Sequence, residues 1–112
     1  MVKYKSQQLD SVFRALSDPT RRSMLRLLAG RERSVGELAA PFQMSFAGAS
    51  KHVRALESAG LVSRTVSGRT HMCRLEPSPL AAIDEWLRFY EGFWRDRLDD
   101  LERELKQRQQ EA

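Results

Sequence analysis

The segment at residues 46–59 combines short side chains with cations in a pattern typical of one exposed face of a helix. Ala49, Val53 and Leu56 are spaced by four and three residues, so they would line the buried side of a helix. A helix that enters the major groove, which is about 12 Å wide, needs short side chains for close approach and Lys or Arg for bases and phosphates. The opposite face of this helix has that composition and carries no acid before Glu57: Ala47, Gly48, Ser50, Lys51, Arg54 and Ala55.

A second basic element follows at residues 61–75. Two runs of strand-forming residues, 61–66 and 70–75, flank Ser67-Gly68-Arg69, which predicts a β-hairpin. Arg69 lies in the turn and Arg64 lies behind it, so guanidinium groups can reach the flanking backbone or the minor groove of DNA. Arg22, on the polar side of an earlier helix, is added to the candidate DNA contacts.

Two helices are predicted ahead of this segment. The first spans residues 7–16 and ends near Ser17, because its apolar residues follow a helical spacing: Leu9, Val12, Phe13 and Leu16. Asp18 followed by Pro19 is typical of an N-cap with proline at the first helical position. The second helix is expected to stop just before Gly30, the type of residue that commonly follows a helix.

Two further cap signals place the third and fourth helices. Ser34 and Glu37 match the capping box, and Pro41 is expected to end this short third helix near Ala40. Ser45 is the expected N-cap of the fourth helix, which Gly60 closes.

The last third of the chain is predicted to form one long helix, at residues 80–108, with Gly92 as its weakest point. Its apolar stripe is too long for one small domain to cover, so a second copy of the chain is expected to cover it. The expected dimer interface combines the first and last helices: Leu9, Phe13, Trp86, Tyr90, Phe93, Trp94, Leu98 and Leu101.

Charge is unevenly distributed along the 112 residues. Residues 1–75 contain thirteen Lys or Arg and five Asp or Glu, whereas residues 76–112 contain six and ten. A basic front segment indicates a polyanionic partner, for which nucleic acid is the leading candidate. With 41% hydrophobic and 30% charged residues, the chain is expected to fold as a single globular domain, residues 1–112, with its core at residues 8–76.

Other classes of function find little support. No apolar stretch approaches the roughly 20 residues of a membrane span, so no membrane partner and a cytoplasmic location are expected. Cys73 is the only cysteine, which excludes a disulfide within one chain. No Ser/His/Asp or Cys/His arrangement, phosphate loop or metal motif is present, so the chain is not expected to be an enzyme.

Four runs of sequence resemble the ArsR family of winged helix-turn-helix repressors, and the resemblance covers roughly residues 8–95. They are FRALSDPTRRSMLRLL, SVGELA, SKHVRALESAGLV and RTVSGRTHMCRL. The resemblance implies a mainly α fold with a small β-hairpin, N- and C-terminal dimerisation helices, and an obligate homodimer on a near-palindromic operator. It also implies that Arg69 lies in the wing and that the following residues occupy recognition-helix contact positions: Ser45, Phe46, Ala47, Ser50, Lys51, His52 and Arg54. Phe46 and Gly48 depart from the family pattern, which usually has a polar residue and a good helix former there.

Metal-sensing members of that family have ligands that this chain lacks. Members that bind arsenic, cadmium or lead use a cysteine pair in the third helix, whereas residues 37–42 here contain no cysteine. Members that bind zinc use histidines and carboxylates in C-terminal helices, and residues 80–112 contain no histidine. The resemblance therefore points to the metal-independent branch that includes autorepressors, with no cofactor and no bound metal.

The sequence leaves alternative roles open for His52, for Cys73 and for the aromatic C-terminal stripe. His52 can contact DNA or can be a partly buried structural residue, whereas His71 is more simply a cross-strand residue of the hairpin. Cys73 can be an inert core thiol or the sensor of a redox-controlled repressor. The aromatic C-terminal stripe can bind another protein, which would make the chain an interaction module.

Overall fold

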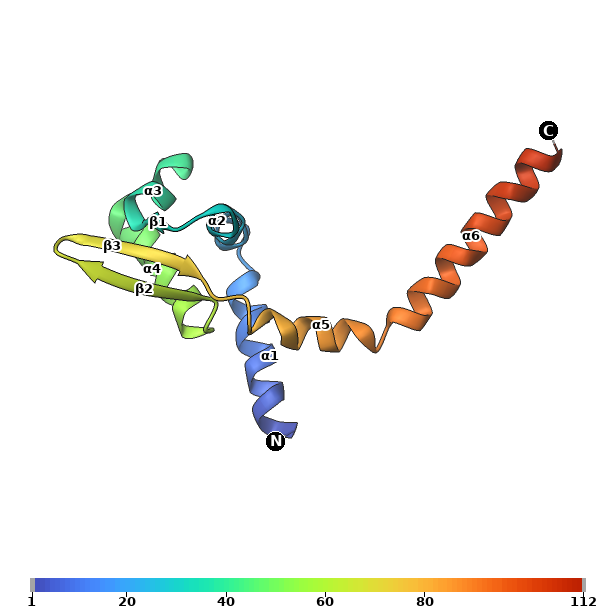
Figure 1. Cartoon of the computed structure of the whole chain (residues 1–112), viewed down its shortest axis with the longest axis horizontal. Helices are drawn as coiled ribbons and strands as arrows, with labels where there is room; N and C mark the ends of the chain where they lie inside the picture. Colours follow the sequence, from blue (N-terminus) through green and yellow to red (C-terminus); the bar gives the residue numbers. More distant parts are fainter. Residues whose placement is uncertain (1, 112) are drawn as a thin grey trace. The chain divides into compact units, whose positions relative to one another are not determined.

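A computed structural model describes residues 2–111, with side chains described from Gln7 onward (Figure 1). The elements in chain order are α1 (Val2–Leu16), α2 (Pro19–Gly30), β1 (Arg33–Ser34), α3 (Val35–Ala39), the 3₁₀ turn η1 (Ala40–Phe42), α4 (Phe46–Ser58), β2 (Val62–Ser67), β3 (Thr70–Leu75), α5 (Leu80–Arg88) and α6 (Glu91–Glu111). The chain forms two compact units, one up to Ala82 and the other from Ile83. The expected mainly helical class with a small antiparallel sheet is confirmed.

The predicted cap of α2 is present. Asp18 Oδ1 accepts hydrogen bonds from the backbone N–H of Thr20 at 2.8 Å and of Arg21 at 3.2 Å. The expected stop before Gly30 is wrong by one residue, because Gly30 is the last residue of the helix. The chain instead leaves α2 at Arg31, which has extended backbone with φ −170° and leads directly into β1.

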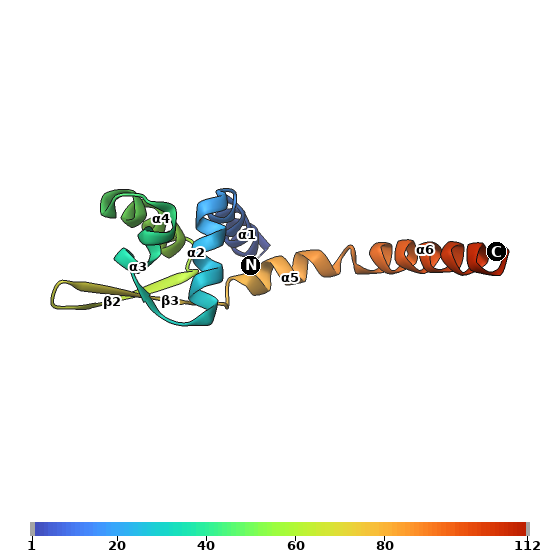
Figure 2. The same cartoon turned by 90° about the horizontal axis from the view of Figure 1, so that it is seen from above.

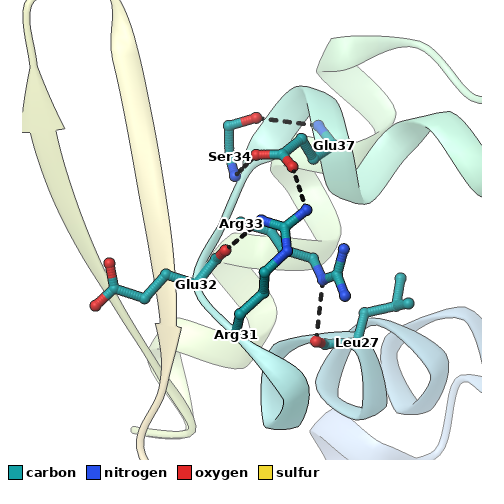
Figure 3. Close-up of polar contacts among 6 residues, drawn as sticks. All are labelled: Leu27, Arg31, Glu32, Arg33, Ser34 and Glu37. Carbon is teal, nitrogen blue, oxygen red and sulfur yellow. Dashed lines mark hydrogen bonds and ion pairs between the residues drawn. The ribbon is translucent and has the colours of Figure 1, made fainter.

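The link from α2 to α3 is held by polar contacts that Figure 3 shows. Ser34 Oγ accepts from the Glu37 N–H and Glu37 Oε1 accepts from the Ser34 N–H, each at 3.1 Å, which is the predicted capping box. Arg31 donates to Glu37 Oε2 at 2.8 Å, and Arg33 Nε donates to the Leu27 carbonyl at 3.0 Å. The Ser34 hydrogen bond and then the Arg31 guanidinium hold the pKa of Glu37 below its ordinary value.

The hydrophobic core of the first unit lies where α1–α4 meet the sheet. Its largest fully buried side chains are Met24, Leu38, Leu56, Leu61, Val12, Val35, Val53 and Cys73. The stripe predicted for α4, of Ala49, Val53 and Leu56, is fully buried. Because burying each large aliphatic side chain contributes roughly 1.5–3 kcal/mol, this core fixes how α4 lies against the other helices.

The sheet has the order β1-β3-β2 and is antiparallel throughout. The β2–β3 hairpin is confirmed, with Ser67 paired to Thr70 and a two-residue turn in which Gly68 has φ +61°. The hairpin turn projects beyond the helices of the first unit in both views (Figure 1, Figure 2). The two-residue strand β1 was not predicted, because such a short strand has no periodicity of its own.

The single C-terminal helix expected at residues 80–108 is wrong, because the chain forms α5 and α6 with an interruption at Phe89 and Tyr90 (Figure 1). The N–H groups of these two residues bond three residues back, to the carbonyls of Trp86 and Leu87. Adjacent aromatic residues followed by Gly92 have low helix propensity, which favours a tightened end of α5 over a continuous helix.

The Asp18 cap predicts a pH-dependent stability. Burial would raise the pKa of Asp18, but the N–H donors of Arg21 and Thr20 and the nearby cationic groups lower it below its ordinary 3.8. A lowered folded-state pKa stabilises the fold above the unfolded value, and this contribution is lost as the pH falls through the folded value. We therefore expect Asp18→Asn, which retains a cap, to lose less unfolding free energy than the wild type when the pH is lowered below about 4.

The measurement is urea unfolding at several pH values, with Asp18→Ala as the comparison. This second variant removes the cap and should be less stable by about 1 kcal/mol at neutral pH. Identical pH profiles for the wild type and Asp18→Asn would contradict the role given to the carboxylate.

Candidate nucleic-acid interface

The N-terminus of α4 is built around Ser45, whose Oγ accepts from the Gly48 N–H at 3.0 Å as predicted. A Cβ at Gly48 would lie 3.3 Å from that Oγ, so glycine leaves room for the cap. Gln43, two residues before Ser45, has a left-handed backbone conformation with φ 54°, and the chain turns there toward α4. The cap thus sets the direction in which the first residues of α4 are presented.

The predicted outward face of α4 is largely confirmed as exposed. Ala47, Lys51 and Arg54 are exposed and follow one face of the helix, and Phe46 at its first position is 58% exposed. Gly48 and Ala55 are half-buried, and Ser50 is buried, with only 6% of its surface exposed. Its placement on the outer face is wrong, because it lies between Ala49 and Val53 at the edge of the buried stripe.

The exposed cations of α4 and of the hairpin turn carry charge that none of the described residues neutralises. Lys51, Arg54 and Arg69 form no ion pair with any residue that the structure describes. Glu57 is the one acid of α4, and its carboxylate is bound by Arg64. The exposed residues Phe46, Ala47, Lys51 and Arg54 of α4 and Arg69 of the hairpin turn, here together called the basic face, therefore have positive charge available to a polyanion.

Arg64 does not project with the tip of the hairpin, so the expectation that its guanidinium is free to reach DNA is wrong. Its side chain is 13% exposed; Nη2 donates to Glu57 Oε1 at 2.6 Å and Nη1 donates to His71 Nδ1 at 3.2 Å. The register explains this, because Arg64 is directly opposite Cys73, and cross-strand partners lie on the same face of a sheet. Cys73 is fully buried, so this face of β2 is turned toward the protein rather than toward a ligand.

The remaining basic candidates cap the end of α1. Arg22 is exposed, and its Nη1 donates to the Leu16 carbonyl at 2.6 Å. Arg21, which sequence reasoning did not select, donates to the Ala15 carbonyl at 2.6 Å and lies 3.5 Å from His52 Nδ1. Because His52 is half-buried beside this guanidinium, its structural interpretation is favoured.

Cys73 lies in the core of the first unit. Burial raises the pKa of its thiol; the Arg64 charge opposes this shift and the Glu57 charge adds to it. A buried cysteine with a raised pKa carries little thiolate, so the redox-sensing alternative is not favoured. Within residues 2–111, no cluster of three or more His, Cys, Asp or Glu is placed to hold a metal ion.

Arg64 is bound by protein side chains whereas Arg69 is exposed, so we expect substitution of Arg64 to affect stability and substitution of Arg69 to affect DNA binding. Arg64→Gln should lower the free energy of unfolding by about 1–3 kcal/mol, because Glu57 and His71 lose their partner. Arg69→Gln should leave stability unchanged and reduce the slope of log affinity against log salt by about two, one for each copy in the dimer. Thermal melts and DNA titrations at several salt concentrations measure both, and a reduced salt slope in Arg64→Gln with unchanged melting would contradict this assignment.

The residues expected in a dimer interface expose apolar surface. Phe13 on α1 is 39% exposed and Leu9 is half-buried. In the second unit, the expected interface residues are 38–62% exposed: Trp86, Tyr90, Phe93, Trp94, Leu98 and Leu101. The charged residues of α6 pair along the helix instead, as in Arg95–Glu91 and Arg108–Glu104. Among the helices of residues 2–111, none has the length and apolar character that a membrane crossing requires.

The chain is similar to known regulators of transcription. A family described as a helix-turn-helix domain matches residues 16–65. The HTH-type transcriptional regulator Rv2034 of Mycobacterium tuberculosis is 36% identical over 74 residues, which are 66% of this chain and 69% of that protein. The transcriptional repressor SdpR of Bacillus subtilis is 33% identical over 79 residues, which are 70% of this chain and 88% of that protein.

Solved structures agree with these relatives. The ArsR family transcriptional regulator RHA00566 has a TM-score of 0.74 and 37% identity, with 80% of this chain and 93% of that one covered. A homodimeric winged helix-turn-helix DNA-binding domain, fragment 1–100 of Mb0332 from Mycobacterium bovis, has a TM-score of 0.61 and 29% identity over 77% of this chain and 80% of that one. These similar proteins are regulators of transcription, not enzymes.

Proposed function

We propose that this chain, which belongs to the ArsR family of winged helix-turn-helix transcriptional regulators, represses transcription as a homodimer bound to a near-palindromic operator. The observation that carries this proposal is the basic face. It consists of exposed residues of α4 and of the hairpin turn, its cations form no ion pair with a described residue, and the acid of α4 is neutralised by Arg64. Such a surface attracts the phosphate backbone while short side chains allow close approach to the bases.

The proposed contacts follow from the exposed residues. In a helix-turn-helix protein the N-terminal part of the recognition helix contacts base edges, which assigns Phe46, Ala47, Lys51 and Arg54 to the major groove. Arg69 would contact the flanking backbone or minor groove from the hairpin turn. The exposed Arg22 and the cap residue Ser45 are proposed to contact phosphates, whereas Ser50 and Arg64 are left out because of their burial.

Dimerisation is supported by the exposed apolar residues of α1, α5 and α6 and by the homodimeric relative from Mycobacterium bovis. A twofold dimer places two recognition helices in successive major grooves, about 34–36 Å apart. A symmetric protein of this kind selects a site with two inverted halves. The inverted repeat is therefore part of the proposal.

Metal independence and a cytoplasmic location complete the proposed function. The α3–η1 segment contains no cysteine and α5–α6 contain no histidine, so ligands for soft or borderline metals are missing where the sensing members hold them. The proposal therefore contains no metal-controlled release of DNA.

The test is selection of bound fragments from randomly sheared DNA of the source genome, followed by footprinting. We expect enrichment of a short inverted repeat, protection of two successive major grooves, and affinity that falls steeply with salt. Equal retention of all fragments would contradict the proposed function. Capture of one specific polypeptide without any enriched fragment would favour an interaction module instead.

A further inference from the structure

The strongest unexplained feature of the basic face is an aromatic ring at its leading end. Phe46 is the first residue of α4, immediately after the cap Ser45, and 58% of it is exposed. Isolated exposed apolar residues are common on proteins, but this one lies on the same element as Lys51 and Arg54, which form no ion pair with a described residue. Its position, more than its exposure, therefore requires an explanation.

The position of Phe46 limits what it can contact in DNA. The first residues of a recognition helix are those that reach base edges. A phenyl ring has no hydrogen-bond donor or acceptor, and neither does its exposed neighbour Ala47, so neither can recognise the polar groups of the bases. The one apolar group that the base pairs present in the major groove is the C5-methyl group of thymine.

We propose that Phe46 determines sequence specificity by packing against the C5-methyl group of a thymine in the major groove. Ala47 extends the same apolar contact, while Lys51 and Arg54, further along α4, contact phosphates or purine edges. Each half of the bound site then carries a thymine at the position that faces the start of α4. This inference rests on the proposed function and adds the chemical group that one part of the site recognises.

The surroundings of Phe46 favour this partner over a second protein. A protein that covered Phe46 would also remove the charges of Lys51 and Arg54 from water, and the only acid of α4 is already engaged with Arg64. DNA supplies both an apolar methyl group and the phosphates that these cations need within one groove. The mixed chemistry of the surface thus matches a thymine-containing duplex.

The experiment uses a library of duplexes with a randomised core, from which the full-length protein selects bound sequences. The enriched duplex is then synthesised with uracil in place of thymine, which removes the methyl group and leaves base pairing unchanged. We expect uracil at the proposed thymine to weaken binding about four-fold per half-site and about fifteen-fold in both, as for loss of one buried methyl group. The control places uracil at thymines of the same duplex that do not face the start of α4, and this replacement should have no effect on binding.

Variants of Phe46 identify the residue that contacts the methyl group. Phe46→Leu should still discriminate thymine from uracil, because it remains apolar, whereas Phe46→Gln should bind both duplexes equally. Since Phe46 is exposed, all three proteins should melt at the same temperature. A Phe46→Gln protein that still discriminates, or a wild type that binds both duplexes equally, overturns this inference alone. Failure to enrich any duplex contradicts the proposed function, and the inference falls with it.

Discussion

Removing the two exposed cations of α4, in the double variant Lys51→Ala/Arg54→Ala, is expected to reduce DNA binding to its non-specific level. Each contact to a base contributes about 1–3 kcal/mol, and a homodimer makes each contact twice. The four contacts together are comparable with the whole difference between specific and non-specific binding, about 4–10 kcal/mol. Few other pairs of surface substitutions are expected to have so large an effect.

The fold should not be affected by this double substitution. Both side chains are exposed, neither forms an ion pair with a described residue, and alanine has the highest helix propensity. Binding is measured by fluorescence anisotropy with the enriched duplex and with an unrelated duplex, and folding is measured by thermal melting.

A matched control removes two cations from α6, in the variant Lys106→Ala/Arg108→Ala. These residues are paired with Glu102 and Glu104 along the helix and lie outside the proposed contact surface. Binding of the enriched duplex should stay within a few-fold of the wild type. Equal losses in both double variants would show that only net charge matters, which contradicts the assignment of α4 as the recognition helix.

The second large effect is expected from charges placed on the apolar stripe of α6. Trp94, Leu98, Leu101 and Leu105 follow one another by four, three and four residues, and each is more than half exposed. In the proposed dimer these side chains are buried by the second copy, at roughly 1.5–3 kcal/mol for each leucine. The variant Leu98→Asp/Leu101→Asp loses this contribution in both copies and would bury four carboxylates without partners.

We therefore expect Leu98→Asp/Leu101→Asp to sediment as a monomer at micromolar concentration and to lose at least a hundred-fold in affinity for the inverted repeat. The matched control, Gln107→Asp/Gln110→Asp, adds the same charge to exposed positions of α6 outside the stripe and should remain dimeric. Analytical ultracentrifugation and anisotropy measure the two properties on the same samples. A dimeric stripe variant would place the dimer interface elsewhere.

Local signals determined most of the elements that present the candidate site. Asp18, Ser45 and the Ser34–Glu37 capping box each satisfy backbone N–H groups within three residues, so their effect is independent of the rest of the chain. The buried stripe of α4 was equally predictable, because helical periodicity depends only on spacing. From these signals followed the order of helices, the hairpin, and the exposure of Lys51 and Arg54.

Features that depend on which surfaces meet could not be predicted in this way. At Phe89 and Tyr90 the backbone N–H groups bond three residues back instead of four, which interrupts the α-helix. The spacing of apolar residues does not distinguish these two hydrogen-bond patterns. The short strand β1 exists only because β3 pairs with it, with Arg33 opposite Cys73. The spacing of residues within one segment does not indicate which distant strand will pair with it.

Residues 8–75 therefore specified by themselves a helix-turn-helix with a hairpin and the cations of its recognition helix. Tertiary structure alone decided which polar side chains that surface retains. Ser50 is absent from that surface because it lies at the edge of the buried stripe of α4. Arg64 is absent because it is paired opposite Cys73 and its side chain binds Glu57. The physical reason is that helical periodicity acts within one element, whereas burial and ion pairing depend on the elements packed against it.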